Sequence, residues 1–210
     1  MAHKPTKKTF VYEQLKNAII SGEIKPGQIL NEAVLAEKYG MGKTPTREAL
    51  LLLANEDFLD SMPRVGYVVS RLTTKDLLEI FSLRLVLETE AIGLAAERIT
   101  AEELAQLEKN NNQEKKVFLE KSPQGSEQAH QLNREFHATI ARASGNLRLE
   151  KIIQSLINDL ERALSFDPYS ADPSQHTEII NSLKTHDKAR AQESMRAHIN
   201  ETRMRLLEIF

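Results

Sequence analysis

The residues best suited to chemistry are histidines on the apolar faces of expected helices. His176 has helical spacing to the aliphatic residues Ile179, Ile180 and Leu183, and His198 lies beside Ile199. His137 follows Asn133 by four residues, so the two side chains are neighbours on one helix face. One amide oxygen and three imidazole nitrogens inside a helical bundle would suit Zn²⁺, Ni²⁺ or another divalent ion, with a position left for a ligand oxygen.

A competing interpretation is that each histidine is a core residue whose ring nitrogens are satisfied by hydrogen bonds. Spacing within single helices does not show whether side chains from different helices converge. His130 lies seven residues before His137 on the same side of the helix and is a further candidate. The residues alone leave a metal site and an ordinary core both open.

Six helices after Leu72 would hold these residues, over about 75–98, 100–121, 126–143, 147–166, 174–185 and 187 to the C-terminus. Thr100 and Glu103 form a capping box, residues 122–125 (SPQG) break the pattern, and Asp187 is an N-cap. The first of these helices is amphipathic, with core positions expected at Leu78, Phe81, Leu85, Ala91 (or Ile92) and Ala95. Short connections predict an antiparallel six-helix bundle over residues 72–210.

Residues 1–71 have a different pattern of elements, which begins with a helix predicted over about 10–21. Residues 31–55 predict two short helices joined by a tight turn. Asn31 caps the first helix, its apolar face comprises Val34, Leu35 and Tyr39, and Gly40 ends it in the left-handed region. In the second helix Thr44 is the expected cap and Pro45 the first helical residue, and the buried positions are Ala49, Leu50 and Leu53.

The start of the second short helix carries polar side chains that would be exposed, namely Lys43, Thr44, Thr46 and Arg47. A recognition helix presents this end to DNA, although a helical hairpin with a basic rim has the same pattern. Residues 58–70 (FLDSMPRVGYVVS) then predict two strands around a turn at 63–66, with Arg64 at its tip. Three helices followed by a β-hairpin favour a winged helix-turn-helix.

Composition is that of an ordinary globular protein. The 210 residues are 40% apolar and 28% charged, and the length favours two domains. Cysteine is absent, which excludes disulfides and thiolate sites and suits a cytoplasmic protein. No signal peptide or membrane segment is expected. Residues 1–71 hold 10 Lys and Arg against 8 Asp and Glu, a small positive excess that supports DNA binding only weakly.

Three segments in the first 71 residues arrive with a specific order and spacing: LKNAIISGEIKPG, LNEAVLAEKYG and KTPTREAL. In these segments the chain resembles the DNA-binding domain of the GntR family of bacterial transcription regulators. The remainder resembles the family's FCD-type effector domain through SLRLVLETEAIGLAA, NREFHATIARASGN, SQHTEII and MRAHI. Six effector-domain helices rather than seven favour a resemblance to the VanR-like subgroup over the FadR-like one.

The resemblance implies a metal site whose ligands fall on Asn133, His137, His176 and His198. Most relatives have Asp where this chain has Asn133, and a neutral amide oxygen binds a cation less strongly. His130 and His186 match no ligand position and are expected to be structural.

The resemblance also implies DNA contacts at Lys43, Thr44, Thr46 and Arg47, with Arg64 and Gly66 on the wing. Many relatives have Arg where this chain has Lys43, which replaces a bidentate contact with a point charge. Some place a DNA-contacting Arg where this chain has Ala33.

Arg84 matches a position that often faces the family's effector cavity and would pair with a carboxylate. The alternative is an intrahelical ion pair with Glu88, four residues later.

Together these features predict a non-enzymatic transcription regulator, most simply a repressor. It would act as a homodimer on a palindromic double-stranded operator and respond to a small organic acid at a divalent metal site, with Zn²⁺ or Ni²⁺ expected. One alternative is a constitutive DNA-binding protein with a structural metal. Another is a metallohydrolase fused to a DNA-binding domain, which is disfavoured because the sequence places no general-base carboxylate beside the expected ligands.

Overall fold

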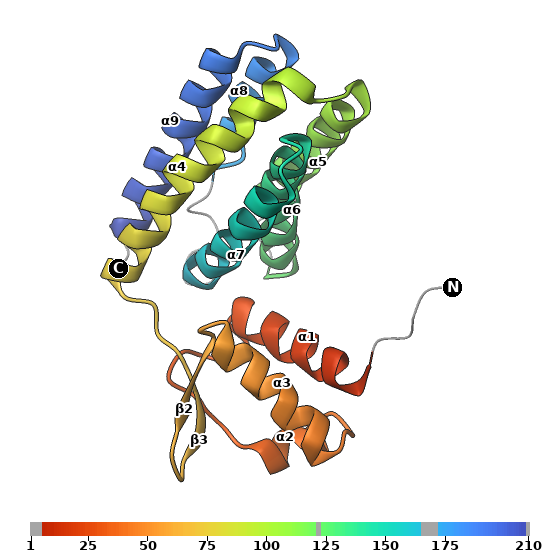
Figure 1. Cartoon of the computed structure of the whole chain (residues 1–210), viewed down its shortest axis with the longest axis vertical. Helices are drawn as coiled ribbons and strands as arrows, with labels where there is room; N and C mark the ends of the chain where they lie inside the picture. The colour runs from red at the N-terminus through yellow and green to blue at the C-terminus, as the bar shows by residue number, and fades with distance from the viewer. Residues whose placement is uncertain (1–5, 121–122, 165–171, 209–210) are drawn as a thin grey trace. The chain divides into compact units, whose positions relative to one another are not determined.

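A computed structural model describes residues 6–120, 123–164 and 172–208 of the chain (Figure 1). The chain divides into two compact units, Met1–Leu72 and Thr73–Phe210. This division falls one residue after the boundary expected from the sequence. Each unit has its own apolar core.

The described residues of the first unit form three helices, α1 (Lys7–Ile20), α2 (Glu32–Lys38) and α3 (Lys43–Asn55). Their core includes Val11 and Leu15 of α1 and Leu50 and Leu53 of α3, all without measurable exposure. Burial of four large aliphatic side chains holds α1 across α3, which fixes the helix that carries the expected DNA contacts.

The start of α2 confirms one local prediction. The Asn31 side chain accepts hydrogen bonds from the backbone N–H groups of Ala33 and Val34. Gly40, with φ +62°, follows the helix in the left-handed region as expected. The buried face is rotated relative to the prediction, however, because Leu35 and Ala36 are buried whereas Val34 is 63% exposed.

The start of α3 corrects another prediction. Its N-cap is Gly42, which makes no side-chain cap, so Thr44 lies inside the first turn and Pro45 is the third helical residue instead of the first. The third residue tolerates proline because its N–H has no intrahelical acceptor. Proline therefore marked the first turn correctly without defining the first residue.

The wing is a three-stranded antiparallel sheet of order β1-β3-β2, formed by β1 (Ile29–Leu30), β2 (Leu59–Met62) and β3 (Gly66–Val69). Leu59 pairs with Val69 and Met62 with Gly66, which confirms the predicted hairpin. Ile29 and Leu30 form a strand against β3 that the sequence had not indicated. A strand of two residues has no detectable period, and only its partner defines it.

The second unit is all helical in its described residues. It contains α4 (Thr74–Arg98), α5 (Ala101–Glu120), α6 (Pro123–Ala143), α7 (Leu147–Leu164), α8 (Ser174–Lys184) and α9 (Lys188–Leu207). The prediction of a mainly α protein with an N-terminal winged helix and a six-helix bundle is confirmed. Six helices are also compatible with the VanR-like resemblance.

Helix starts in this unit follow local signals. Thr73 and Asp76 form a capping box at α4, Thr100 and Glu103 form another at α5, and the Asp187 side chain accepts from the N–H of Arg190 at α9. The predicted face of α4 was wrong at one position, because Leu78 is 46% exposed and its neighbour Leu77 is buried.

Packing brings α4 alongside α9 and places α5 and α7 against α6 (Figure 1). The principal core includes Phe81 of α4, Phe136 and Ile140 of α6, Leu183 of α8 and Met195 of α9. In the described part of the chain, no helix is both long and apolar enough to cross a bilayer. The bundle thus surrounds a core to which α6, α8 and α9 each contribute a histidine.

Candidate functional site

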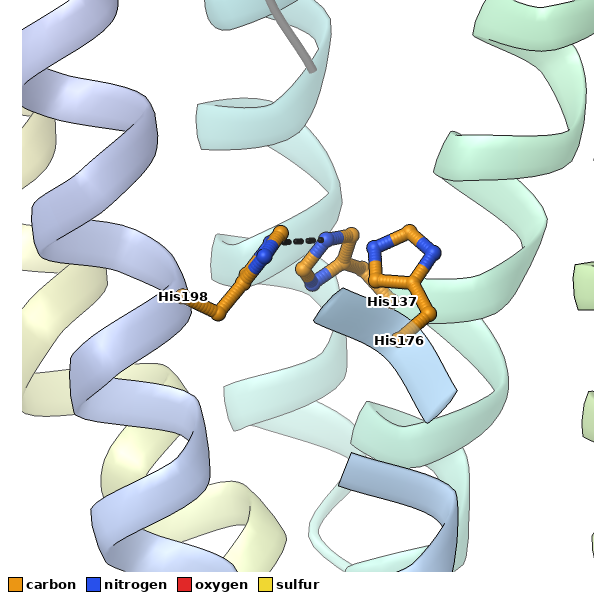
Figure 2. Close-up of side chains that lie close together, drawn as sticks. All are labelled: His137, His176 and His198. Carbon is orange, nitrogen blue, oxygen red and sulfur yellow. Dashed lines mark hydrogen bonds between the residues drawn. The ribbon is translucent and has the colours of Figure 1, made fainter. Parts of the chain in front are cut away.

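Three buried imidazoles from three helices meet inside the bundle. His137 of α6, His176 of α8 and His198 of α9 turn their rings toward one another (Figure 2). One nitrogen from each lies within 4.8 Å of the other two. The side chains are at most 4% exposed. The sequence placed His176 and His198 on core faces and His137 on a face adjoining one, and the fold brings the three faces together.

Each ring is oriented by a hydrogen bond at its other nitrogen. Nδ1 of His137 lies 2.5 Å from a Glu88 oxygen, Nδ1 of His176 lies 2.9 Å from a Glu114 oxygen, and Nδ1 of His198 lies 2.8 Å from Gln175 Oε1. Carboxylate and amide oxygens only accept, so all three Nδ1 atoms carry the proton. All three Nε2 atoms therefore present lone pairs.

These lone pairs make the site suitable for a cation. The Nε2 atoms of His137 and His198 are only 3.3 Å apart, so two acceptors face each other. His176 Nε2 is buried and has no hydrogen-bond partner among the described residues. A divalent ion between three neutral imidazoles would satisfy all three nitrogens. The donor set fits Zn²⁺ or Ni²⁺ with at least one coordination position left for another ligand.

Burial favours the neutral form of two of these imidazoles, His137 and His198. Burial lowers the pKa of His137, only partly opposed by the Glu88 charge, and burial beside His176 and His137 places the pKa of His198 well below its ordinary value. Burial alone would raise the pKa of Glu88, but the charge of Arg84 and the hydrogen bond from His137 outweigh it and lower that pKa to about 2. Neutral imidazole is the form that binds a metal.

Arg84 is joined to this site through Glu88. Its Nε donates to Glu88 Oε1 at 2.5 Å, and both side chains are at most 2% exposed. The predicted alternative, an ion pair at four-residue spacing, is therefore present. The pair leaves Nη1 and Nη2 of Arg84 buried without a hydrogen-bond partner in the described part of the chain. Two unsatisfied donors on a buried guanidinium are unusual and match the fork of a carboxylate.

The remaining candidates of this unit are placed as follows. Asn133 is 4% exposed and lies one turn before His137 on α6, where its role as a ligand stays a prediction. His130 is buried outside the three-histidine group, and burial followed by the charge of Arg134 lowers its pKa to about 4. His186 lies after α8, where its Nδ1 contacts the carbonyl oxygen of Ala96 at 2.8 Å.

Sequence reasoning missed Glu114 and Gln175 as partners of the imidazoles. A signal for Glu114 was present, since it falls seven residues after the buried Leu107 and three before the buried Val117. A charged residue in phase with an apolar stripe indicates a buried partner. Gln175 precedes His176 directly and had no comparable signal.

The second candidate surface is the start of α3. Lys43, Thr44 and Arg47 are exposed there, as predicted. Thr46 is not, because it has no measurable exposure and its hydroxyl donates to the carbonyl oxygen of Gly42 at 3.0 Å. The prediction that Thr46 is exposed was wrong. Thr46 precedes Ala49, Leu50 and Leu53 by three, four and seven residues, so it shares the buried face of α3.

The wing tip presents Arg64, which is exposed between β2 and β3 with φ +67°. Gly66 opens β3 with φ +117°, and a Cβ there would approach the carbonyl oxygen of Leu30 to 2.9 Å. Only glycine combines this dihedral with this contact. Gly66 is therefore required by the wing's backbone, whatever its role toward DNA.

Family comparisons agree with both units. Residues 7–69 match the family described as bacterial regulatory proteins, gntR family, and residues 79–201 match the FCD domain. The chain belongs to the GntR family. It is accordingly a DNA-binding transcription regulator with an FCD-type second domain.

Among GntR-family relatives, the chain is 32% identical to an uncharacterised HTH-type transcriptional regulator, YdhC of Bacillus subtilis, over 90% of this chain and 86% of the relative. It is 27% identical to the gluconate operon transcriptional repressor of the same organism over 94% and 84% of the two chains. The solved structure of McbR/YncC from E. coli superposes with a TM-score of 0.85 at 26% identity, over 98% of this chain and 99% of that one.

Proposed function

We propose that this regulator is a repressor whose affinity for its operator is set by a small organic acid bound at a divalent metal ion in the second unit. The observation that supports the proposal is one buried assembly. One ring nitrogen of each imidazole lies within 4.8 Å of the other two, and a guanidinium linked to them by Glu88 has two nitrogen atoms without an acceptor among the described residues. An acid bound to the ion by one carboxylate oxygen would satisfy those donors with another.

His137, His176 and His198 would hold the ion, with Asn133 as a further oxygen ligand. The ion supplies positive charge and an open coordination position. Arg84 would select an anionic ligand, since a buried guanidinium favours bidentate pairing with carboxylate. The site supports acid binding better than hydrolysis, because the two carboxylates beside the imidazoles, Glu88 and Glu114, are both engaged at Nδ1 atoms.

On the DNA side, Lys43, Thr44 and Arg47 would contact the major groove, with Arg64 and Gly66 at the wing. The buried Thr46 is no longer among the proposed contacts. One winged helix reads few base pairs, so two copies on a palindrome are expected.

A surface for the second copy is available in the bundle. Leu83 and Val86 of α4 are 51% and 66% exposed, and Ile152 of α7, which packs against α4, is 49% exposed. Exposed aliphatic side chains on adjoining helices are typical of an association surface. Val86→Asp should convert the proposed dimer to a monomer in light scattering, whereas the same change at the solvated position Lys151 of α7 should not.

Metal content tests the first part of the proposal. Protein purified without chelator should carry about one divalent ion per chain. His137→Ala should abolish metal binding, because His176 and His198 lie on other helices and cannot replace the lost nitrogen. His130→Ala is the matched control on the same helix and should keep the ion. Full occupancy in His137→Ala would show that the ligands are misassigned.

Operator binding in the presence of organic acids tests the second part. The cognate acid should change operator affinity by about 5- to 150-fold, the usual range of coupling between sites. Arg84→Met leaves the buried Glu88 without its counter-charge, so it is compared where its bundle is folded. There it should bind metal and operator but lose this response. If no acid in a broad panel changes operator affinity of the metal-loaded protein, the ion only stabilises the bundle and the protein binds DNA constitutively.

A further inference from the structure

The three imidazoles are supported unequally. His137 and His176 donate from Nδ1 to the carboxylates of Glu88 and Glu114, whereas His198 donates to the neutral amide oxygen of Gln175. A carboxylate partner makes an imidazole a stronger electron donor to a metal and fixes its orientation. A neutral amide does both less well, so His198 is the weakest donor of the set.

The supports also differ in how firmly they are held. Glu88 is itself tied to Arg84, and Glu114 is only 3% exposed. Gln175 is only partly buried, and its Nε2 has no hydrogen-bond partner among the described residues. Gln175 also directly precedes His176 on α8, while His198 belongs to α9. Sliding of α9 along α8 would therefore break this one support and leave the other two intact.

We propose that His198 is the exchangeable ligand of the metal centre: His137 and His176 would hold the ion permanently, and one oxygen of an acid would take the coordination position of His198. This inference rests on the proposed metal site and specifies its regulation. Exchange conserves the coordination number, because one acid oxygen replaces one imidazole nitrogen. The displaced His198 stays neutral and keeps its Nδ1 proton.

The exchange has a route to the rest of the bundle. His198 lies on α9, which packs along α4, and α4 begins directly after the winged helix (Figure 1). Gly93 of α4 allows a close approach to α9, since a Cβ there would come within 2.7 Å of the Gln192 side chain. Release of His198 removes the ion's hold on α9 and changes the packing partner of α4.

Zn²⁺ affinity measured by competition with a chromophoric chelator tests the ranking of the ligands without any acid. The loss of Zn²⁺ affinity in His198→Ala should be about tenfold smaller than the loss in His137→Ala or His176→Ala. The reason is that His198 is the ligand without a carboxylate partner. Circular dichroism of each variant shows whether the helices are retained.

A second variant strengthens the weak ligand. Gln175→Glu changes an amide to a carboxylate of the same shape and should tighten Zn²⁺ binding about tenfold, whereas Glu114→Gln, the reverse change beside His176, should weaken it about 10- to 100-fold. The visible spectrum of bound Co²⁺ provides a readout of the coordination itself. Adding acetate to the wild-type protein should change this spectrum toward that of His198→Ala with acetate. The same change in Gln175→Glu should require a higher acetate concentration.

Equal losses for His198→Ala and His176→Ala, or no tightening in Gln175→Glu, would overturn the inference and make His198 a permanent ligand. An acetate titration that leaves the wild-type Co²⁺ spectrum unchanged would overturn the inference too, because no imidazole would have been displaced. Wild-type protein that binds no Zn²⁺ would instead overturn the proposed metal site itself. The two failures are therefore distinguishable in one series of titrations.

Discussion

The two units keep their polar side chains in opposite places. In the winged helix, Lys43, Arg47 and Arg64 are exposed, and Thr46 is the only buried polar side chain among that unit's described residues. In the bundle, Arg84, Glu88 and three imidazoles are almost completely buried. The winged helix therefore has an apolar core and a polar working surface, whereas the bundle has its proposed working site inside the core.

This difference determines how function and stability are related. An exposed charge loses little hydration on folding and adds little to stability, so it can be changed without affecting the fold. A buried charge depends on its partners, because removing one leaves the other desolvated and uncompensated. Substitutions at the proposed DNA contacts should therefore change binding alone, and substitutions in the bundle should change stability as well.

The largest effect is expected for Glu88→Ala. The change leaves Arg84 buried without a counter-charge and should lower the free energy of unfolding of the metal-free bundle by about 3–5 kcal/mol. Hydrogen exchange of the α4–α9 amides with a chelator present measures it. The double variant Arg84→Met/Glu88→Leu removes both charges and should be far less destabilised. A loss below about 1 kcal/mol for Glu88→Ala would mean that the bundle tolerates a lone buried charge.

A buried carboxyl away from the imidazoles gives the next effect. Glu161 of α7 has no exposed side-chain surface and forms an ion pair with Arg134. Burial raises its pKa to about 7 from an ordinary 4.5, although Arg134 opposes the shift. Between these values the folded protein keeps a proton that the unfolded chain has lost, so this group's contribution to stability falls as the pH rises from 4.5 to 7.

Glu161→Gln removes the free-energy cost of ionising this buried carboxyl. The variant should be more stable than wild type by about 2–3 kcal/mol at pH 8 and by much less at pH 5, since each pKa unit is worth about 1.4 kcal/mol. Unfolding measured at both pH values tests this. A stability difference that does not vary with pH would show that Glu161 is ionised throughout.

Arg47→Ala tests the exposed polar surface of the winged helix. It should weaken binding to a site selected from random DNA by about 1–3 kcal/mol while leaving the stability of the winged helix within about 0.5 kcal/mol. Lys7→Ala, at the exposed start of α1, is the control, and any loss there should be the same on every DNA sequence. Equal losses for Arg47→Ala on selected and random DNA would reduce its role to phosphate contact.

The smallest effect is expected for Thr46→Val. Valine keeps the shape of the buried side chain but cannot donate to the Gly42 carbonyl oxygen, so stability should fall by about 1 kcal/mol. Affinity for DNA, measured where the winged helix is fully folded, should be unchanged. A loss of DNA affinity without a loss of stability would return Thr46 to the contact surface and weaken the contrast between the units.

The sequence predicted the kind and order of elements well, because long amphipathic periods and capping residues are local properties. The prediction of burial failed where a shift of one residue along a helix decides which side chain is exposed. Leu77 and Leu78 differ by about 100° around α4, and either fits the period approximately. A similar error favoured Val34 over Ala36 in α2. Thr46 in α3 was misjudged because it is polar, although its spacing places it on the buried face.

At the candidate site, the sequence located each histidine on or beside a core face but gave no information on whether the three converge. The pairs Glu88–His137 and Glu114–His176 join residues 49 and 62 positions apart on different helices, and no period connects them. Arg84 and Glu88 were recognisable as neighbours because they share a helix. That the same Glu88 also binds His137 depends on how α4 packs against α6, which only the fold supplies.

The start of α4 has a consequence for how such proteins arise. The Thr73 backbone N–H and hydroxyl both donate to the Asp76 carboxylate, and Thr73 in turn accepts from the Asp76 N–H. The helix thus begins with a capping box formed between its own residues. A gene segment that begins at this codon would encode a bundle with its first turn already capped. Recombination at this point can join the bundle to a different winged helix without removing a hydrogen bond that starts α4.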